Sequence, residues 1–355
     1  MNNIVCVTDS RGWVQEQRIN QLARYIDDFR FELVTADHFA ERWNAGEGRD
    51  NPVYFCSWRT IRGLENSRRC KFAPEDFRRF MASVTSHYNI GGGLDPVKAL
   101  PRGADRKEAF DTATEFLRRF RVVTANSRIL YDLLSPYVDG LIYAPNGVDT
   151  TRFCAAPNKT YDPAGIRIGW VGKLKAAKNF EIIDEVRDSV AAMGFEWRVL
   201  AVNKSGPRPG HRFTGLAQWL RRLHLPVLAQ RTGASAHQGP LSPLEMPSFY
   251  HGIDYYLCTS WHEGTPNPAL EAASCGVPVV STSVGNMPEL IRHGENGFFV
   301  EPTTECIVGR FRQVRSLDVD RYGAMSANMR KAIEQHWSWE ARTGNFVEAF
   351  RALVS

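Results

Sequence analysis

Two pairs of charged side chains stand out as groups that could do chemistry together. Glu263 and Glu271 are separated by seven residues, and Lys173 and Lys178 by four. A carboxylate accepts hydrogen bonds from hydroxyl groups through both of its oxygens, and a lysine beside a strand-to-helix loop can neutralise a diphosphate. The residue types therefore indicate a ligand that combines hydroxylated rings with phosphate groups.

The elements around the glutamates are those of a strand–helix–strand unit. The short apolar run 255–258 predicts a strand, and the Gly- and Pro-bearing segment 259–266 predicts a loop. A second apolar run, 277–281, predicts another buried strand. Since ligands of open parallel sheets bind at the carboxyl ends of the strands, we expect the loop to face a cleft.

The helix between these strands has clear start and stop signals. Asn267 is a favoured N-cap, Pro268 suits the first helical position, and Gly276 is placed to end the helix. Because Pro268 has no N–H, the free donors are expected at Asn267, Ala269 and Leu270, where the positive end of the helix dipole favours phosphate. Phosphate would repel the glutamates, so we expect those to contact hydroxyl groups, as in a sugar nucleotide.

The whole stretch resembles the donor site of the GT4 family of retaining glycosyltransferases. The resemblance rests on Glu263-Gly-Thr-Pro-Asn-Pro-Ala-Leu-Glu271, followed by Gly276-Val-Pro-Val-Val and Gly285-Asn-Met-Pro-Glu289. It implies that Glu271 binds the ribose hydroxyls and Glu263 the transferred sugar. It also makes the intervening residues donor-binding: Gly264, Thr265, Pro266 and Asn267. The alternative is that both glutamates only stabilise a helix dipole.

The lysine pair belongs to a second stretch that resembles this family. Gly172-Lys-Leu-Lys-Ala-Ala-Lys178 follows the predicted strand 166–171, and Asn179 is expected to cap the next helix. The family has a basic pair at this spacing, usually Arg and then Lys. Lys173 replaces the arginine, so a point charge stands where a bidentate fork is usual. The resemblance implies that Gly172 and both lysines contact the donor; two solvated loop lysines are the alternative.

Two sites in the first half carry weaker signals. Gly12 stands in the loop after the first predicted strand, where the family approaches the donor phosphates, but the usual glycine pair is reduced to Gly12-Trp13. His87 follows the strand-like piece 82–86 and matches the histidine that the family holds near the transferred sugar. A histidine bonded to loop backbone is the alternative, and an ordinary turn is the alternative for Gly12.

Two further residues resemble the family's loop that holds the nucleotide base through backbone groups. They are Pro240 and Leu241, in a stretch that ends with Glu245-Met246 opening the next helix. Such contacts do not indicate which base is bound.

The chain length and the alternation of predicted strands and helices indicate the architecture. The 355 residues favour two domains, and strands alternating with helices in both halves predict the α/β class with parallel sheets. The resemblance implies the GT-B fold, in which two Rossmann-like domains face a central cleft. We expect an acceptor-binding domain at 1–157, a domain for the nucleotide sugar at 158–335, and a terminal helix at 336–355 that crosses back to the first domain.

Composition excludes several other classes. The seven cysteines are odd in number and form no C-x-x-C pair, which argues against a disulfide framework or a zinc site and favours a reducing cytoplasm. No apolar run reaches the ~20 residues that span a bilayer, and no secretory signal is visible. The net charge of +5 is mild, and no nucleic-acid-reading motif is present, so nucleic acid is not an expected partner.

A basic segment at 59–79 has two interpretations. It holds seven arginines and lysines against three acidic residues, which is typical of a solvated surface. The second interpretation is a patch for the acceptor or for an anionic membrane, because enzymes of the resembled family often take lipid-linked or glycan acceptors. On that interpretation the protein is cytoplasmic and peripheral at the inner face of the cell membrane.

The expected reaction follows from the resemblance. It is transfer of a sugar from a nucleoside diphosphate sugar to a hydroxyl of a glycan or lipid-linked acceptor, with retention, in cell-surface polysaccharide or lipopolysaccharide synthesis. The catalytic residues would be His87, Lys173, Lys178 and Glu263. No metal and no cofactor are expected, since no Asp-x-Asp motif accompanies the donor site. The alternatives are a hydrolase or epimerase of the same fold and an inactive homologue that only binds the nucleotide sugar.

Overall fold

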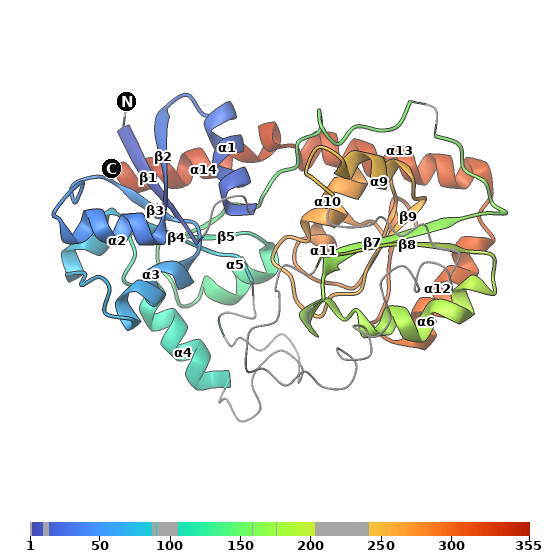
Figure 1. Ribbon diagram of the computed structural model, residues 1–355, viewed down its shortest axis with the longest axis horizontal. Helices are drawn as coiled ribbons and strands as arrows, with labels where there is room; N and C mark the ends of the chain where they lie inside the picture. Colours follow the sequence, from blue (N-terminus) through green and yellow to red (C-terminus); the bar gives the residue numbers. More distant parts are fainter. Residues whose placement is uncertain are drawn as a thin grey trace. The chain divides into compact units, whose positions relative to one another are not determined.

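The chain divides into two compact units, each built on one parallel sheet (Figure 1). The computed structural model describes residues 2–9, 14–86, 90, 106–157, 159–174, 176–202 and 241–355. Unit 1 comprises Met1–Gly147, His262–Thr265 and His336–Ser355, and unit 2 comprises Val148–Trp261 and Pro266–Gln335. The predicted α/β class with two Rossmann-like domains is confirmed.

Unit 1 contains a six-stranded sheet in the order β2-β1-β3-β4-β5-β6, and every pairing is parallel. The side chains of β1 alternate between two cores: Val5 and Val7 enter one, and Ile4 and Cys6 enter the other. Both faces of the sheet are therefore buried. The strands are β1 Asn2–Thr8, β2 Phe29–Thr35, β3 Val53–Phe55, β4 Phe80–Val84, β5 Val122–Ala125 and β6 Leu141–Tyr143.

Helices cover both faces of the unit 1 sheet. The last helix of the chain packs beside α1, where Phe346 and Phe350 join Ile19 and Leu22 in one core (Figure 1). The chain ends therefore both lie in unit 1. The helices are α1 Val14–Tyr25, α2 Ala36–Asn44, α3 Trp58–Asn66, α4 Arg106–Leu117, α5 Arg128–Leu134 and α14 Trp339–Val354, with a 3₁₀ turn η1 at Pro74–Arg79.

Unit 2 contains a five-stranded parallel sheet in the order β11-β10-β9-β7-β8. Its central strand β9 is buried along its whole length, as its continuous apolar sequence predicts for a parallel sheet covered on both faces. The strands are β7 Arg167–Lys173, β8 Glu196–Val202, β9 Tyr255–Cys258, β10 Val279–Ser281 and β11 Gly297–Phe299.

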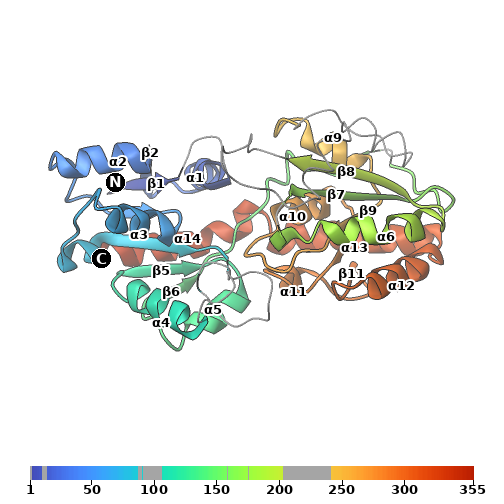
Figure 2. The same cartoon turned by 60° about the horizontal axis from the view of Figure 1, so that its bottom comes forward.

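The helices of unit 2 bury their apolar sides on this sheet. On one face α6 and α12 lie side by side (Figure 2), and their apolar residues share a core with the strands. The helices are α6 Glu181–Ala191, α9 Met246–His251, α10 Asn267–Ser274, α11 Met287–Leu290, α12 Thr304–Arg315 and α13 Val319–His336, with a 3₁₀ turn η3 at Ala176–Lys178.

Two predicted helix caps are wrong. The N-cap of α10 is Pro266, so Asn267 is already helical. Asn179 does not cap α6, which begins at Glu181; Asn179 is buried and adopts a positive φ of 48°. In both cases the preceding loop is held by tertiary contacts, which override the capping preference of asparagine.

Candidate functional site

Backbone hydrogen bonds fix the C-terminal end of α10, the helix that carries Glu271. At its C-terminus the amides of Gly276 and Val277 bond to the carbonyls of Ala273 and Ala272, and Gly276 has a φ of +73°, as this type of helix ending requires. The predicted end at Gly276 is therefore confirmed.

The amide donors at the start of α10 differ from the prediction. The N–H groups of Ala269 and Leu270 both bond to the Pro266 carbonyl, at 2.8 Å and 3.2 Å. They are thus engaged within the helix. Asn267 is the remaining predicted donor, and its amide makes no hydrogen bond with the described part of the chain.

Glu271 lies in a polar contact with the neighbouring helix α9. The Tyr250 hydroxyl donates to Oε2 of Glu271 at 2.6 Å. Burial raises the pKa of the Glu271 carboxyl to about 7, against the smaller lowering effects of the Tyr250 hydrogen bond and the positive charge of Arg152. Residue 271 as a whole remains partly exposed. The carboxyl is thus held in one place, and near neutral pH it exists in both its protonated and its ionised form.

The lysine pair lies at the carboxyl end of β7 and in the turn that follows it. Lys173 is the last residue of β7, so the predicted loop from Gly172 onward begins two residues later than expected. Lys178 ends the turn η3, which packs on the segment that follows β9. There the Thr259 hydroxyl donates to the Lys178 carbonyl at 3.0 Å, and the Trp261 amide donates to the Ala177 carbonyl at 2.8 Å.

Unit 2 therefore places several of the predicted donor residues at one edge of its sheet. Strands β7 and β9 are direct neighbours, and the chain runs from β9 through Thr259 toward α10. This edge holds the carboxyl ends of the strands, where ligands of open α/β sheets bind. The predicted donor residues that belong to unit 2 are Gly172, Lys173, Lys178, Leu241, Pro266, Asn267 and Glu271.

The other predicted donor residues of the motif, Glu263, Gly264 and Thr265, are grouped with unit 1. A Cβ atom on Gly264 would lie 1.9 Å from the carbonyl oxygen of Thr85, which is closer than atoms can approach. The Asn126 side-chain amide donates to the Thr265 hydroxyl at 3.2 Å. Only glycine fits at position 264, and the two glutamates of the motif belong to different units.

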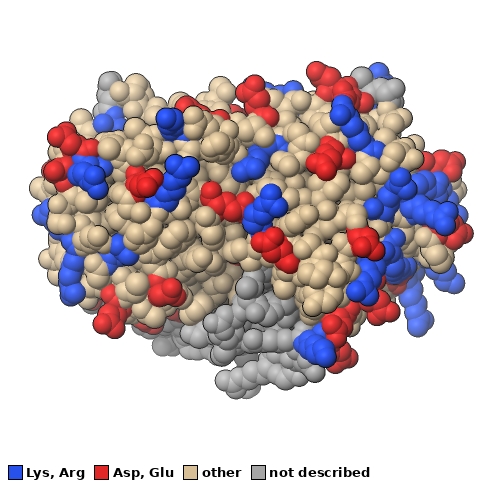
Figure 3. Space-filling model, turned by 180° about the vertical axis from the view of Figure 1, so that it is seen from behind, with Lys and Arg blue, Asp and Glu red and all other residues tan. Residues whose placement is uncertain are grey.

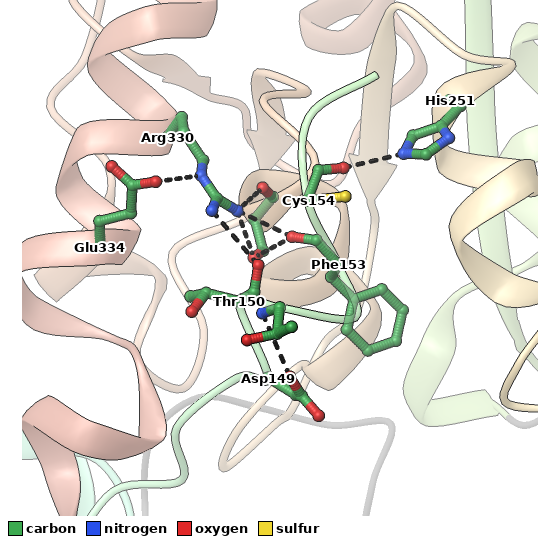
Figure 4. Close-up of polar contacts among 9 residues, drawn as sticks. Asp149, Thr150, Phe153, Cys154, His251, Arg330 and Glu334 are labelled. Carbon is green, nitrogen blue, oxygen red and sulfur yellow. Dashed lines mark hydrogen bonds and ion pairs between the residues drawn. The ribbon is translucent and has the colours of Figure 1, made fainter. Parts of the chain in front are cut away.

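Residues 148–154, which follow the boundary between the units, form the connecting segment. This segment is bound tightly to the rest of unit 2 (Figure 4). Nη1 of Arg330 donates to the Phe153 carbonyl at 2.8 Å and to the Ser274 carbonyl, and Nη2 donates to the Thr150 carbonyl at 3.3 Å. Nε of Arg330 pairs with Glu334 at 2.6 Å. One arginine of α13 thus joins the connecting segment to the last turn of α10.

The same connecting segment reaches the surroundings of Glu271. The ring of Phe153 packs edge-on against Tyr250, with centroids 6.0 Å apart, and the charge of Arg152 favours the ionised form of Glu271. The His251 ring is 2.8 Å from the Cys154 carbonyl (Figure 4). The sequence predictions did not include Tyr250, Arg152 or Arg330, because their roles depend on contacts between segments distant in the sequence.

Three predicted site residues, Gly12, His87 and Pro240, lie outside the described residues. Within the described ranges, no group of three or more His, Cys, Asp or Glu side chains is placed to hold a metal ion. None of the helices in the described part of the chain is both long and apolar enough to cross a membrane.

The basic segment 59–79 is partly neutralised within unit 1. Arg69 pairs with Asp37 at 2.6 Å, and Arg79 pairs with Asp50 at 2.9 Å. Figure 3 shows basic side chains gathered at the edge of unit 1 on the right, with acidic side chains among them. These ion pairs fit the interpretation as a solvated surface, and the membrane contact stays a prediction.

The sequence of unit 2 matches a known family. Residues 165–314 match the family described as glycosyl transferases group 1. The match covers 150 of the 355 residues, which is less than half of the chain. The matched residues include Lys173, Lys178 and Glu271, and all of the predicted donor residues of unit 2 named above fall among them.

Curated relatives are similar over part of the chain. The D-inositol 3-phosphate glycosyltransferase of Rhodococcus erythropolis (strain PR4 / NBRC 100887) is 26% identical over 226 residues, which cover 62% of this chain and 48% of that protein. The O-antigen chain mannosyltransferase B of Escherichia coli is 30% identical over 124 residues, covering 35% of this chain and 32% of that protein. The aligned part thus spans about half the length of these relatives, or less.

Solved structures are similar over the whole chain. Sucrose-phosphate synthase from Thermosynechococcus elongatus has a TM-score of 0.75 at 15% identity, with 100% of this chain and 99% of that chain covered. The Anabaena protein HepE, solved with UDP and glucose, has a TM-score of 0.70 at 15% identity, with coverages of 99% and 100%. These likenesses confirm the GT-B fold that the sequence predicted.

Proposed function

We propose that this protein is a retaining glycosyltransferase that moves a sugar from a nucleoside diphosphate sugar to a hydroxyl of a glycan or lipid-linked acceptor. The observation that supports the proposal is the carboxyl edge of the unit 2 sheet, where the turn that carries Lys178 packs on the segment leading to α10 and Glu271, all within the residues that match group 1 glycosyl transferases. This combination offers positive charge for a diphosphate beside a carboxylate for hydroxyl groups.

Each group has a distinct role in the proposed reaction. Departure of the nucleoside diphosphate builds negative charge on its phosphates, and Lys173, Lys178 and the N-terminus of α10 stabilise that charge. Glu271 accepts hydrogen bonds from the ribose hydroxyls in its ionised form, and Glu263 does so from the transferred sugar. These side chains do not change charge during transfer, so the protein acts by positioning and electrostatics.

The remaining features of the proposal concern stereochemistry and setting. With retention, the acceptor hydroxyl attacks from the side that the diphosphate leaves, so its proton can pass to the departing phosphate. A general base and a metal ion are not required on this path.

The proposed setting is cell-surface polysaccharide or lipopolysaccharide synthesis on the cytoplasmic side of the membrane, and the O-antigen relative supports that choice.

The test begins with thermal unfolding in the presence of a chelator and a panel of nucleoside diphosphates: UDP, GDP and ADP, with CMP as a monophosphate. A ligand at about 100 times its dissociation constant adds roughly 2.7 kcal/mol to the free energy of unfolding, or a few degrees in Tm. One nucleotide is expected to stabilise the protein. Stabilisation by none of them would contradict the proposal.

The second step follows the reaction of the matching nucleotide sugar. Acceptor-dependent release of the nucleotide indicates transfer, and NMR of the product gives its anomeric configuration. Release without acceptor would indicate a hydrolase instead, and binding without turnover would indicate an inactive homologue.

A further inference from the structure

Unit 1 buries a positive charge to which the proposed donor site assigns no role. Arg18 of α1 is 4% exposed. Its Nη1 donates to the Tyr54 hydroxyl at 2.9 Å and approaches Oγ of Ser83 at 3.5 Å. Among the described residues Arg18 has no ion pair, and its Nε–H is buried without a hydrogen-bond acceptor.

The described ionisable groups that act directly on Arg18, Tyr54 and Cys56, are neutral at physiological pH. The Asp9 carboxylate acts on Cys56 and contacts Thr60 and Gln15 instead of Arg18. Burial raises the pKa of Tyr54 and that of Cys56 to about 12 each, although the charge of Arg18 opposes both shifts. Burial also raises the pKa of Cys6 well above its usual value. A buried charge is costly unless an opposite charge accompanies it, and the described part of unit 1 places none against this guanidinium.

Among the described residues, the hydrogen bonds around Arg18 leave donors unused. Tyr54 and Ser83 share a hydrogen bond of 2.7 Å between their hydroxyls, and Ser83 and Thr124 share one of 2.6 Å. Three hydroxyl protons are thus available for two hydrogen bonds, whichever way each bond points. Within the described ranges one hydroxyl proton is left over in addition to the Nε–H of Arg18, so the cluster has donors to offer to a further acceptor.

The cluster is buried and lies beside the carboxyl edge of the unit 1 sheet. Ser83 and Thr124 are the next-to-last residues of β4 and β5, two adjacent strands whose carboxyl ends lie at the same edge of the unit 1 sheet. Ligands of open parallel sheets bind outside this edge. The Arg18 cluster therefore combines an unbalanced cation and surplus donors at the ligand-binding edge of the sheet.

We propose that Arg18, Tyr54, Ser83 and Thr124 form a binding site for the phosphate group of a small molecule. A guanidinium offers two parallel N–H donors to one oxyanion, and hydroxyl groups complete such a site by donating to the remaining oxygens. The phosphate supplies the missing negative charge and the missing acceptors at once. Where unit 1 receives the acceptor, the site selects acceptors that carry a phosphate; this last step rests on the proposed function.

The test measures thermal unfolding of the full chain against inorganic phosphate, with chloride at the same ionic strength as the reference. Saturating UDP, or the nucleotide that stabilises the protein best, is present so that the donor site is already filled. A saturable rise in Tm of about 2–4 °C is expected for the wild type at phosphate concentrations well above the dissociation constant. Acetate replaces phosphate in a parallel series, and an equal response to acetate would overturn the assignment to phosphate.

Two variants test whether the phosphate-dependent rise in Tm depends on Arg18. Arg18→Gln is expected to abolish the phosphate-dependent rise in Tm, to keep the rise caused by the nucleotide, and to be no less stable than the wild type in chloride. Arg24→Gln, which removes the same charge from an exposed position of the same helix, is expected to retain both responses. Equal phosphate responses in Arg18→Gln and the wild type would overturn the proposal.

A measurement on the wild type alone covers the case in which Arg18→Gln does not fold. Phosphate is expected to slow hydrogen exchange in peptides that contain α1 and the ends of β4 and β5, and an unchanged exchange rate there would overturn the site. Failure of the proposed function has a different signature. It would appear as absence of any nucleotide response, whereas the Arg18-dependent phosphate response would remain.

Discussion

The Tyr250 hydroxyl donates a 2.6 Å hydrogen bond to Oε2 of Glu271, which joins the helix before β9 to the helix after it. Both residues belong to unit 2, and Tyr250 is fully buried. A neutral donor of this kind holds a carboxylate in place without cancelling its charge. The carboxylate therefore stays available as an acceptor for a ligand.

Replacement of Tyr250 by Phe should destabilise the protein by about 1–2 kcal/mol at pH 8, and by less at pH 5. The reason is that a hydrogen bond to an ionised carboxylate is stronger than one to a protonated carboxyl group. Urea unfolding at the two pH values measures the difference. Tyr137→Phe, at an exposed position, serves as the control. An equal loss at both pH values would contradict the role assigned to the Tyr250 hydroxyl.

Replacement of Glu271 by Gln should stabilise the protein at pH 8 and change little below pH 4.5. The pKa of Glu271 is about 7 in the folded protein, above its usual value of 4.5. The folded state therefore holds a proton that the unfolded state has lost, so stability falls as pH rises from 4.5 through 7. Glutamine removes this dependence on pH. The free energy of unfolding of Glu271→Gln at pH 8 is therefore expected to exceed that of the wild type by about 1–3 kcal/mol. A difference in stability that does not vary with pH would show that the pKa of Glu271 is not raised.

Replacement of Gly264 by Ala should cost about 1–3 kcal/mol, because the new Cβ would overlap the Thr85 carbonyl oxygen and backbone would have to move. Gly63→Ala is the matched control in unit 1. Position 63 lies in α3 with no atom within 4 Å of the added Cβ, so alanine there should stabilise by about 0.5–1 kcal/mol. Urea unfolding measures both. Equal effects of the two substitutions would contradict the close packing of the 262–265 segment.

Replacement of Arg330 by Met should loosen the connecting segment and destabilise unit 2 by about 2–4 kcal/mol. It leaves the carbonyls of Phe153 and Ser274 without their charged donor. Limited trypsin digestion should then cleave faster after Arg152. Lys331→Met, at the next and exposed position of α13, should leave the cleavage rate unchanged. Cleavage at the wild-type rate in Arg330→Met would mean that other contacts hold the segment.

Local sequence signals predicted the elements of the site better than its contacts. The apolar run 255–258 became β9 with the same bounds, and Gly276 ends α10 as expected, since strand length and a left-handed glycine are local properties. The strand predicted at 277–281 is shorter, because pairing with β9 and β11 begins only at Val279.

The contacts of Glu271 and Arg330 could not be predicted from local signals. Tyr250 lies 21 residues before Glu271, and Phe153 lies 177 residues before Arg330. Asn179 was expected to cap a helix, but the Thr259 hydroxyl approaches its carbonyl at 3.3 Å and the residue is buried in a turn. Such arrangements depend on the packing of the whole unit and not on the preference of one residue.

The most direct test of the account is a calorimetric titration of the best-binding nucleoside diphosphate and its 2′-deoxy analogue. Wild type and Glu271→Ala are compared, with Glu295→Ala as an exposed control in unit 2. If Glu271 binds the ribose hydroxyls, the wild type and the control should prefer the ribose form by about tenfold, or roughly 1.4 kcal/mol, and Glu271→Ala should lose this preference. A preference that persists in Glu271→Ala, or a wild type that binds neither nucleotide, would contradict the proposed donor site.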